Sequence, residues 1–522
     1  MGMARAKKLQ CPETWLRERA VGAFLHISSL PSRQGIGCLG KEAREWIDFL
    51  SESGFRYWQF CPIGPTGFGD SPYQTFSSLA GNPYFIDLDD LIQRGYLQDE
   101  DMHPLETLSA EYVDYGKLYA EFPSKLEKAF RRFLELKHDE SSEFSGFCEK
   151  ESFWLPIYSL FMALKELFNG QSFARWPEHF QNPGKVTDSF IKTILNENQD
   201  LHFLYKKHRF IQFIFHQQWL HLRQYAHSKG ISLIGDIPIF PGMDSADFWG
   251  YRSIFQTDEN GKAQWVAGVP PDAFSKEGQL WGNPLFDWEA LQKEHYSWWL
   301  QRFRQAQRFF DVVRIDHFRG FYDYWAIPPR SLDARKGRWR KGPGIRFFQE
   351  IFQEMADLKC IAEDLGMLSP GVHHFIKASH LPGMNILQFA FDGHPQNIYL
   401  PHMHEKNSVL YLGTHDNDTT HGWYASLSAE KQDYVRRYFR SDGSSIAWDM
   451  IRWAYASPCR LLILSLQDLL SLGSEARLNT PSTRSGNWTW RCQSEVFWKL
   501  RDHSGNYLQE LAHLYGRIGE NG

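Results

Sequence analysis

Eight short apolar segments, each ending in polar or glycine-rich residues, constrain the fold of this chain most strongly. Several of them follow helix-like stretches, for example Glu42–Ser51, Gln212–His227 and Arg346–Met355. Alternating strands and helices of this length favour a parallel α/β fold, and eight repeats predict a (β/α)8 TIM-type barrel, with a doubly wound open sheet as the alternative. The predicted strands are Val21–Ile27, Phe55–Ile63, Ile231–Gly235, Val312–Ile315, Lys359–Ala362, Ile386–Phe391, Val409–Gly413 and Leu461–Leu466.

The length of the chain requires large insertions in this barrel. A minimal barrel needs only about 250 residues, whereas this chain has 522. Residues 64–228 are helical in character and predict a helical subdomain on the rim of the barrel. Residues 237–300, rich in glycine, proline and aromatics, predict long ordered active-site loops, and residues 467–495 a C-terminal one. We therefore predict one catalytic barrel over residues 1–522 with helical and loop insertions.

The composition bears on possible partners. Lys and Arg number 57 and Asp and Glu 62, a net charge of −5 that gives no general attraction for nucleic acid or anionic membranes. The one candidate basic patch is 335–341 (RKGRWRK), for which a solvated loop and phosphate binding are the two interpretations. The chain also holds 20 Trp, 22 Tyr and 40 Phe. This excess suits a sugar-binding cleft, because flat rings stack on the apolar faces of pyranoses.

Other features indicate the compartment. Seven scattered cysteines without a C-x-x-C pair favour reduced thiols and a cytoplasmic protein. Met1–Gln10 lacks the apolar run of a signal peptide, and no apolar stretch is long enough to span a bilayer. Phosphate-binding loops and dinucleotide fingerprints are also missing from the sequence.

Three of the predicted strands end in an acid that stands beside charged or imidazole side chains. These acids are Asp316, Glu363 and Asp416. Each alone could cap the helix that follows its strand, but the C-terminal ends of barrel strands meet at a single active site. Cleavage of a glycosidic bond needs a protonated acid at the leaving oxygen and a carboxylate on the other face of the sugar. A third carboxylate could stabilise the positive charge that develops on the ring.

The neighbouring charges suggest which acid does what. Strand alternation puts Arg314 and Asp316 on the same side, so Arg314 should lower the pKa of Asp316 and keep it ionised as the nucleophile. Glu363 has no adjacent cation, and nearby aspartates would raise its pKa, which suits a proton-holding acid/base. In a retaining reaction two such carboxyl groups lie roughly 5–5.5 Å apart.

A metal site is the alternative use of these polar residues. Asp416-Asn417-Asp418 could be part of a calcium loop, but the glycine and the distal glutamate of that loop are missing from the sequence. His402 and His404 form an H-x-H pair that precedes its strand, which favours a surface loop. We therefore predict no metal.

Longer motifs around the acids resemble the amylomaltases, the disproportionating 4-alpha-glucanotransferases allied to the α-amylase clan. The resemblance covers the chain from about residue 21 to about residue 500 and implies a (β/α)8 barrel with insertions and no organic cofactor. Its motifs are RIDHFRG, AEDLG, GTHDNDTT, HISSLPS, GDSPYQTFSSLAGNPY, LIGDIPIF, DSADFW, VAGVPPDAFS, GQLWGNP, PGMNILQFAF and NTPSTRSGNWTWR.

The resemblance also implies roles for individual residues. Asp316 would be the nucleophile, Glu363 the acid/base and Asp416 the transition-state stabiliser that grips the distorted donor sugar. Trp281 would lie over the cleft and help to hold the glucan. The substrate-binding residues would be Arg314, His317, His415, Asp236, Tyr73, Ser71, Asp364 and Trp281, with Asn487 and Trp488 from the C-terminal loop.

Two positions depart from the family pattern. Relatives often carry a histidine at Met243 and a tyrosine at Phe286. Neither change touches the three acids, so we expect them to affect acceptor preference and loop contacts but not the reaction class.

The sequence therefore predicts a 4-alpha-glucanotransferase. It would cleave an α-1,4-glucan with retention through a covalent glycosyl-enzyme and transfer the segment to the 4-hydroxyl of glucose or of another α-1,4-glucan. Its expected partners are maltooligosaccharides, glycogen or starch chains, and glucose as acceptor. A retaining α-glucan hydrolase, a catalytically silent glucan-binding protein and a metal-dependent barrel hydrolase are the alternatives, and the oligomeric state stays open.

Overall fold

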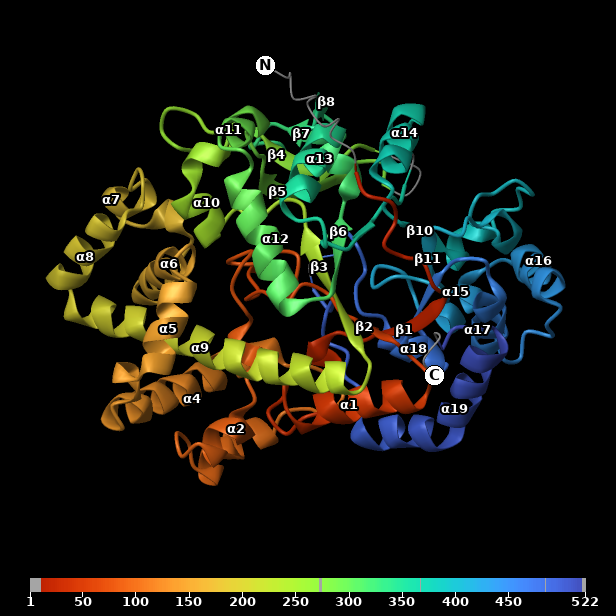
Figure 1. Cartoon of the computed structure of the whole chain (residues 1–522), viewed down its shortest axis with the longest axis horizontal. Helices are drawn as coiled ribbons and strands as arrows, with labels where there is room; N and C mark the ends of the chain where they lie inside the picture. Colours follow the sequence, from red (N-terminus) through yellow and green to blue (C-terminus); the bar gives the residue numbers. More distant parts are fainter. Residues whose placement is uncertain (1–10, 272–274, 367, 484, 519–522) are drawn as a thin grey trace, which may run out of the picture.

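A (β/α)8 barrel forms the centre of the protein (Figure 1). The computed structural model describes residues 11–271, 275–366, 368–483 and 485–518. Eight parallel strands pair in the order β10-β11-β12-β1-β2-β3-β6-β9, which confirms the predicted fold class. They are β1 (Ala20–Phe24), β2 (Tyr57–Gln59), β3 (Ser232–Pro238), β6 (Val312–Asp316), β9 (Cys360–Ala362), β10 (Gly383–Ile386), β11 (Ser408–Tyr411) and β12 (Leu461–Ser465).

The two end strands of this sheet, β9 and β10, almost close the barrel. The Ala362 N–H donates to the carbonyl of Pro382 at 2.9 Å, just before β10 begins. Beyond β9, the Asp364 carboxylate takes the place of a backbone carbonyl and accepts from the Met384 N–H at 2.7 Å. The strand ends therefore meet around a single rim.

Helices cover the outside of the barrel, so each strand is buried on both faces and reads as a continuous apolar run. On α1, for example, Trp46, Phe49 and Leu50 point inward and are fully buried. The covering helices are α1 (Lys41–Glu52), α9 (Gln199–Ser228), α12 (Ser297–Phe309), α13 (Ile345–Glu354), α14 (Pro370–Ser379), α15 (Thr420–Ser426), α16 (Ala429–Phe439), α17 (Ile446–Ala456), α18 (Leu466–Leu469) and α19 (Ser494–Leu514).

The sixth strand differs from its prediction. The strand was expected over Ile386–Phe391, but β10 covers Gly383–Ile386, and Leu387–Ala390 form a turn of 3-10 helix. Leu387 and Ala390 are nevertheless fully buried. A short apolar run indicates burial, and it does not distinguish a strand from a buried helical turn.

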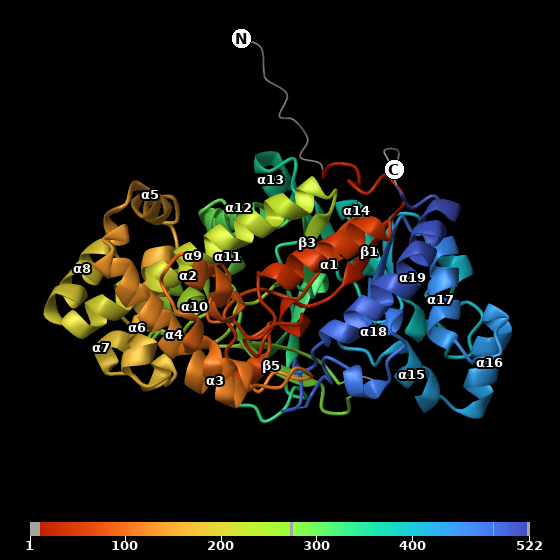
Figure 2. The same cartoon turned by 90° about the horizontal axis from the view of Figure 1, so that it is seen from below.

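Between β2 and β3 the chain leaves the barrel and forms a helical lobe. Figures 1 and 2 show α4 to α8 together on one side of the molecule, with α9 running from the lobe back along the barrel. Helix α6 packs against both α9 and α10. The helices of this segment before α9 are α2 (Leu88–Gln93), α3 (His103–Glu106), α4 (Tyr115–Glu135), α5 (Ser142–Lys150), α6 (Leu155–Leu167), α7 (Glu178–Gln181) and α8 (Asp188–Glu197).

A second sheet corrects two loop predictions. Strands β4 (Val266–Val269), β5 (Gln279–Pro284), β7 (Asp323–Ile327) and β8 (Arg338–Lys341) form an antiparallel sheet in the order β5-β4-β7-β8. Residues 237–300 are thus not loops alone, since they also hold α10 (Ala246–Gly250) and α11 (Trp288–Lys293). The candidate basic patch, residues 335–341, ends in strand β8 and is therefore not a loop throughout. Asp272–Phe274, within the VAGVPPDAFS motif, lie outside the described residues.

Two global features complete the fold. All seven cysteines are buried and free. Among the helices of the described residues, none combines the length and the apolar character needed to cross a membrane.

Candidate active site

A buried ion pair between Arg314 and Asp236 anchors the candidate site. The two residues face each other in the ladder between β3 and β6, and each is 3% exposed. Arg314 Nη1 donates to Asp236 Oδ2, and also to Asp316 Oδ1 at 3.2 Å. The Tyr73 hydroxyl donates to the same Asp236 oxygen at 2.8 Å. One guanidinium therefore fixes two carboxylates at the ends of neighbouring strands.

Glu363 directly follows β9 and lies beside the end of β6. Its own N–H donates to the carbonyl of Ile315 at 3.1 Å, so the pairing of β6 and β9 continues past the strand ends. The backbone N–H of His317 donates to Oε2 at 2.7 Å, and that of Leu365 to Oε1 at 3.0 Å. His317 has a φ of 51°, in the left-handed region, which is uncommon outside glycine. The backbone around Glu363 therefore holds its carboxylate in a defined orientation.

The protonation of Asp316 and Glu363 differs in part from the expectation. Burial raises the pKa of Asp316, and the charges of Asp236, Glu363 and Asp416 raise it further, whereas Arg314 lowers it. Burial also raises the pKa of Glu363, as expected for an acid/base. The prediction that Arg314 keeps the pKa of Asp316 low is wrong, because Arg314 shares its charge with Asp236 and burial outweighs the remainder.

A substitution of Asp236 tests this sharing. In Asp236→Asn, one negative charge is lost and Arg314 is left to pair with Asp316, so the pKa values of Asp316 and Glu363 both fall. Both apparent pKa values of the pH–kcat/KM profile should therefore fall by about one unit, whether or not the maximal kcat/KM changes. The matched control is Asp247→Asn, which changes another buried aspartate that accepts from the Ser78 N–H. Limbs that stay in place would contradict the shared-charge explanation.

Asp416 lies in the loop after β11 and is held by the C-terminal loop. Asn479 Nδ2 donates to Asp416 Oδ1 at 2.6 Å, and Arg477 Nη2 donates to the Asp416 carbonyl at 2.7 Å. The side chain of Asp416 is 49% exposed, and its Oδ1 lies 3.4 Å from His415 Nε2. Asn479 and Arg477 were not singled out from the sequence. Asn479 opens the NTPSTRSGNWTWR motif, but no local pattern connects it to an acid 63 residues away.

Aromatic rings stand on either side of these acids. Tyr73 stacks on His415 with ring centroids 5.0 Å apart, and Trp488 packs on Tyr73 at 5.9 Å and on His415 at 5.7 Å. On the other side, Trp281 of β5 meets His317 edge-on at 4.8 Å. The structure thus gathers rings from three distant segments around Arg314 and the acids.

Three of the predicted substrate-binding residues accept hydrogen bonds from nearby backbone N–H groups of the protein. Ser71 Oγ accepts from the Tyr73 N–H at 3.3 Å. Asn487 Oδ1 accepts from the Thr480 N–H at 2.9 Å and so shapes the C-terminal loop. Asp364 bonds to the start of β10, and burial raises its pKa to about 7. A role in glucan binding stays a prediction for all three.

The two departures from the family pattern lie at different depths. Phe286 is fully buried and stacks on Phe255 at 4.9 Å, so its missing hydroxyl bears on packing inside the protein, and an effect on acceptor preference stays a prediction. Met243 is partly buried and packs against a cluster of Val266 and Ile327 from the second sheet and Ala334 from the connection between β7 and β8.

Asn417 and His404, which the sequence offered as metal ligands, form hydrogen bonds within the protein. In the part of the chain that the structure describes, no group of three His, Cys, Asp or Glu side chains is arranged to hold an ion. Asn417 Oδ1 accepts from the Thr414 N–H at 2.9 Å. His404 is buried and bonded to Ser457, so the prediction of a surface loop is wrong there.

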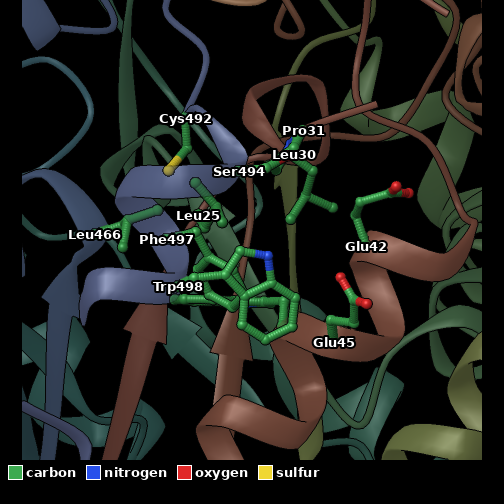
Figure 3. A pocket seen from close by; sticks show the side chains of 11 residues that line it. Leu25, Leu30, Pro31, Glu42, Glu45, Leu466, Cys492, Ser494, Phe497 and Trp498 are labelled. Atoms are coloured by element: carbon green, nitrogen blue, oxygen red, sulfur yellow. The ribbon is translucent and has the colours of Figure 1, made fainter. Parts of the chain in front are cut away.

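A small cavity lies between the barrel rim, α1 and α19 (Figure 3). Its lining is largely apolar, with Leu25, Leu466 and Trp498 among the residues drawn. The carboxylates of Glu42 and Glu45 stand on one side of it. The lining residues do not include the three acids, so this cavity is separate from the candidate site.

Comparison with known proteins identifies the family. A family model described as 4-alpha-glucanotransferase matches residues 25–496. The chain belongs to this family. 4-alpha-Glucanotransferases from Streptococcus pneumoniae and Thermus thermophilus are 41% and 44% identical to it, over 97% and 91% of this chain and 99% and 94% of theirs. Amylomaltase from Streptococcus agalactiae in complex with acarbose matches with a TM-score of 0.91 and 35% identity, over 96% of this chain and 100% of that one. The predicted family and the prediction of a glycosyl-transferring enzyme are confirmed.

Proposed function

We propose that this 4-alpha-glucanotransferase cleaves α-1,4-glucans and transfers the released segment to the 4-hydroxyl of glucose or of another α-1,4-glucan. The observation that supports the proposal is the presence of two separately held acids. Asp316 accepts a hydrogen bond from Arg314, and two backbone N–H groups orient Glu363. Two carboxyl groups with separate supports at one barrel rim suit a retaining mechanism.

In this mechanism Glu363 protonates the leaving glycosidic oxygen while Asp316 attacks the anomeric carbon. The products are a shortened glucan and a covalent glycosyl-enzyme with inverted configuration. Glu363, now ionised, then takes a proton from the 4-hydroxyl of the acceptor, which displaces Asp316 with a second inversion. The net result is retention. Burial raises the pKa of Glu363, which is the direction that a proton-donating acid requires.

The remaining residues would bind the donor sugar. Asp236 Oδ1 is buried and makes no hydrogen bond within the described residues, so it is available to a sugar hydroxyl. Asp416, half exposed and steadied by Asn479, would grip the distorted donor ring as the transition state forms. The partly exposed ring of Trp281 would stack on a glucose unit and keep water from the glycosyl-enzyme, whereas Trp488, only 3% exposed, would support Tyr73 and His415 by packing on them. Free buried cysteines support a cytoplasmic location for the enzyme.

Incubation with maltotriose, followed by separation of the products by size, tests this function. Glucose together with maltopentaose and longer chains is the expected result, because transfer lengthens one chain as it shortens another. Glucose and maltose alone would show that water is the acceptor and that the protein is a hydrolase. Unchanged maltotriose and unchanged longer glucans would favour a silent glucan-binding protein.

A further inference from the structure

Trp281 stands on a bulge in β5 and not on a regular part of that strand. The register between β4 and β5 shifts here, so that residues 281–283 of β5 stand opposite Ala267 of β4 alone. Gly282 has a φ of 80°, a conformation that glycine adopts without strain. A bulge interrupts the ladder of hydrogen bonds locally and turns a side chain in a new direction. The position of the Trp281 ring therefore depends on contacts outside the ladder.

The side chain of Gln74 provides such a contact from the loop that carries Tyr73. Gln74 Nε2 donates to the Trp281 carbonyl at 3.3 Å and to Asn283 Oδ1 at 3.1 Å. Asn283 is 5% exposed, and its Nδ2 donates to the carbonyl of Pro241 at 2.8 Å. Since a carbonyl can only accept, this bond fixes the direction of the Asn283 amide and leaves its oxygen for Gln74. One amide group therefore holds both ends of the bulge.

The backbone that carries Gln74 is itself well fixed. The N–H of Gly67 donates to the Gln74 carbonyl at 2.7 Å, and the N–H of Phe76 donates to the Pro65 carbonyl at 2.9 Å. The two sides of this loop thus pair with each other. Tyr73, one residue before Gln74, donates to the buried Asp236. A single short loop therefore supports a ring of the candidate site and anchors the bulge that carries a second ring.

The remaining contacts of Trp281 orient its ring but do not fix the backbone of the bulge. Trp281 Nε1 donates to Gln279 Oε1 at 3.0 Å, and Gln279 lies on the same strand. The ring meets His317 edge-on, and the N–H of His317 donates to Glu363. A shift of the bulge therefore moves the ring relative to the predicted acid/base, and the bond from Gln74 opposes that shift.

We propose that Gln74 is a positioning residue, which holds Trp281 over the site and so sets how often a glucan, and not water, captures the glycosyl-enzyme. The Nε2 group of Gln74 has two hydrogens, and its two hydrogen bonds use both, so it acts through the bulge and not by donating to a sugar. A ring excludes water only where it is held in place. The inference rests on the proposed function, and the test below separates the two.

The ratio of hydrolysis to transfer measures this role. Gln74→Met keeps the length of the side chain and loses both donated hydrogen bonds. With maltotriose as substrate, transfer conserves the number of reducing ends and each hydrolysis adds one, so both rates can be followed in one reaction. The ratio should rise about fivefold or more in this variant. Gln74→Glu turns a carboxylate toward two acceptor oxygens and should give at least the same rise, which keeps the test valid if the methionine variant does not fold.

Gln256→Met is the matched control. Gln256 is also partly buried, and its Nε2 donates to the carbonyl of Phe286, two residues beyond β5, and to the hydroxyl of Tyr324. This substitution removes a similar amide bridge without touching the bulge, so the ratio should stay within about twofold of wild type. An unchanged ratio in Gln74→Met, or an equal rise in Gln256→Met, would overturn the proposal.

A double-mutant cycle shows whether Gln74 acts through Trp281. In a protein that carries Asp316→Asn, calorimetry with maltoheptaose should give a dissociation constant about fivefold higher for Gln74→Met. In a Trp281→Ala background the same substitution should change it by less than about twofold, because no ring is left to position. Equal effects in both backgrounds would overturn the proposal. Coupling in a protein that lengthens no maltotriose chains would leave the positioning role standing and reject the proposed function instead.

Discussion

Replacing Asp316 by asparagine lowers kcat for the disproportionation of maltotriose by at least about 10⁴-fold, the size of effect found when a nucleophile is removed. Asparagine keeps the shape of the side chain and an oxygen that can accept from Arg314, so the fold and the ion pair with Asp236 should persist. It cannot form the glycosyl ester, and both chemical steps depend on that ester. Steady-state kinetics with maltotriose, combined with the melting temperature, measures the loss and checks the fold.

The same strand provides a matched control for this substitution. Asp311 precedes β6 at its opposite end, where it pairs with Arg223 at 2.6 Å and accepts from the Leu233 N–H at 2.8 Å. Asp311→Asn should therefore lower the melting temperature while kcat stays within about threefold of wild type. If Asp316→Asn kept more than about 1% of wild-type kcat, the nucleophile would have to be a different group.

The barrel could be predicted from the sequence because most of its strands lie in short apolar runs that end in polar residues. Strand β10 is an exception, because the apolar run Ile386–Phe391 is mostly a buried helical turn. Parallel strands buried on both faces need that pattern wherever they occur, so local sequence locates them. The second sheet has no comparable signal. Strand β4 pairs with β7, which follows after about 50 further residues, and β8 reads RWRK, with a charge at three of its four positions. Its pairing arises from tertiary contacts.

In the candidate site, too, some residues could be predicted from the sequence and others could not. Asp316, Glu363 and Asp416 could be picked out because each follows a predicted strand, and barrel geometry brings strand ends together. The hydrogen-bond partners of these acids could not be predicted, because the register of the strands must be known before distant residues can be paired. Arg314 shows the consequence: sequence spacing gave it a single partner, Asp316, and the structure gives it a second, Asp236. Burial, together with the negative charge of this second partner, reverses the expected direction of the pKa of Asp316.

Replacing Glu363 by glutamine lowers kcat for maltotriose by about 10²- to 10⁴-fold, the usual contribution of a general acid/base. The loss should depend on the leaving group, which distinguishes Glu363 from Asp316. Fluoride leaves without a proton, so α-maltotriosyl fluoride should still glycosylate Asp316 in this variant. Deglycosylation then lacks its base, and the glycosyl-enzyme should accumulate to a level that intact-protein mass spectrometry detects.

Azide completes the comparison, because it is a small nucleophile that needs no general base. Added azide should raise the turnover of α-maltotriosyl fluoride by Glu363→Gln and give a glycosyl azide of retained configuration. Asp316→Asn should show neither the covalent adduct nor this rescue, because it has lost the attacking oxygen. Equal losses on maltotriose and on the fluoride in Glu363→Gln would mean that Glu363 does not protonate the leaving oxygen. The two hydrogen bonds from His317 and Leu365 would then serve only to position a structural carboxylate.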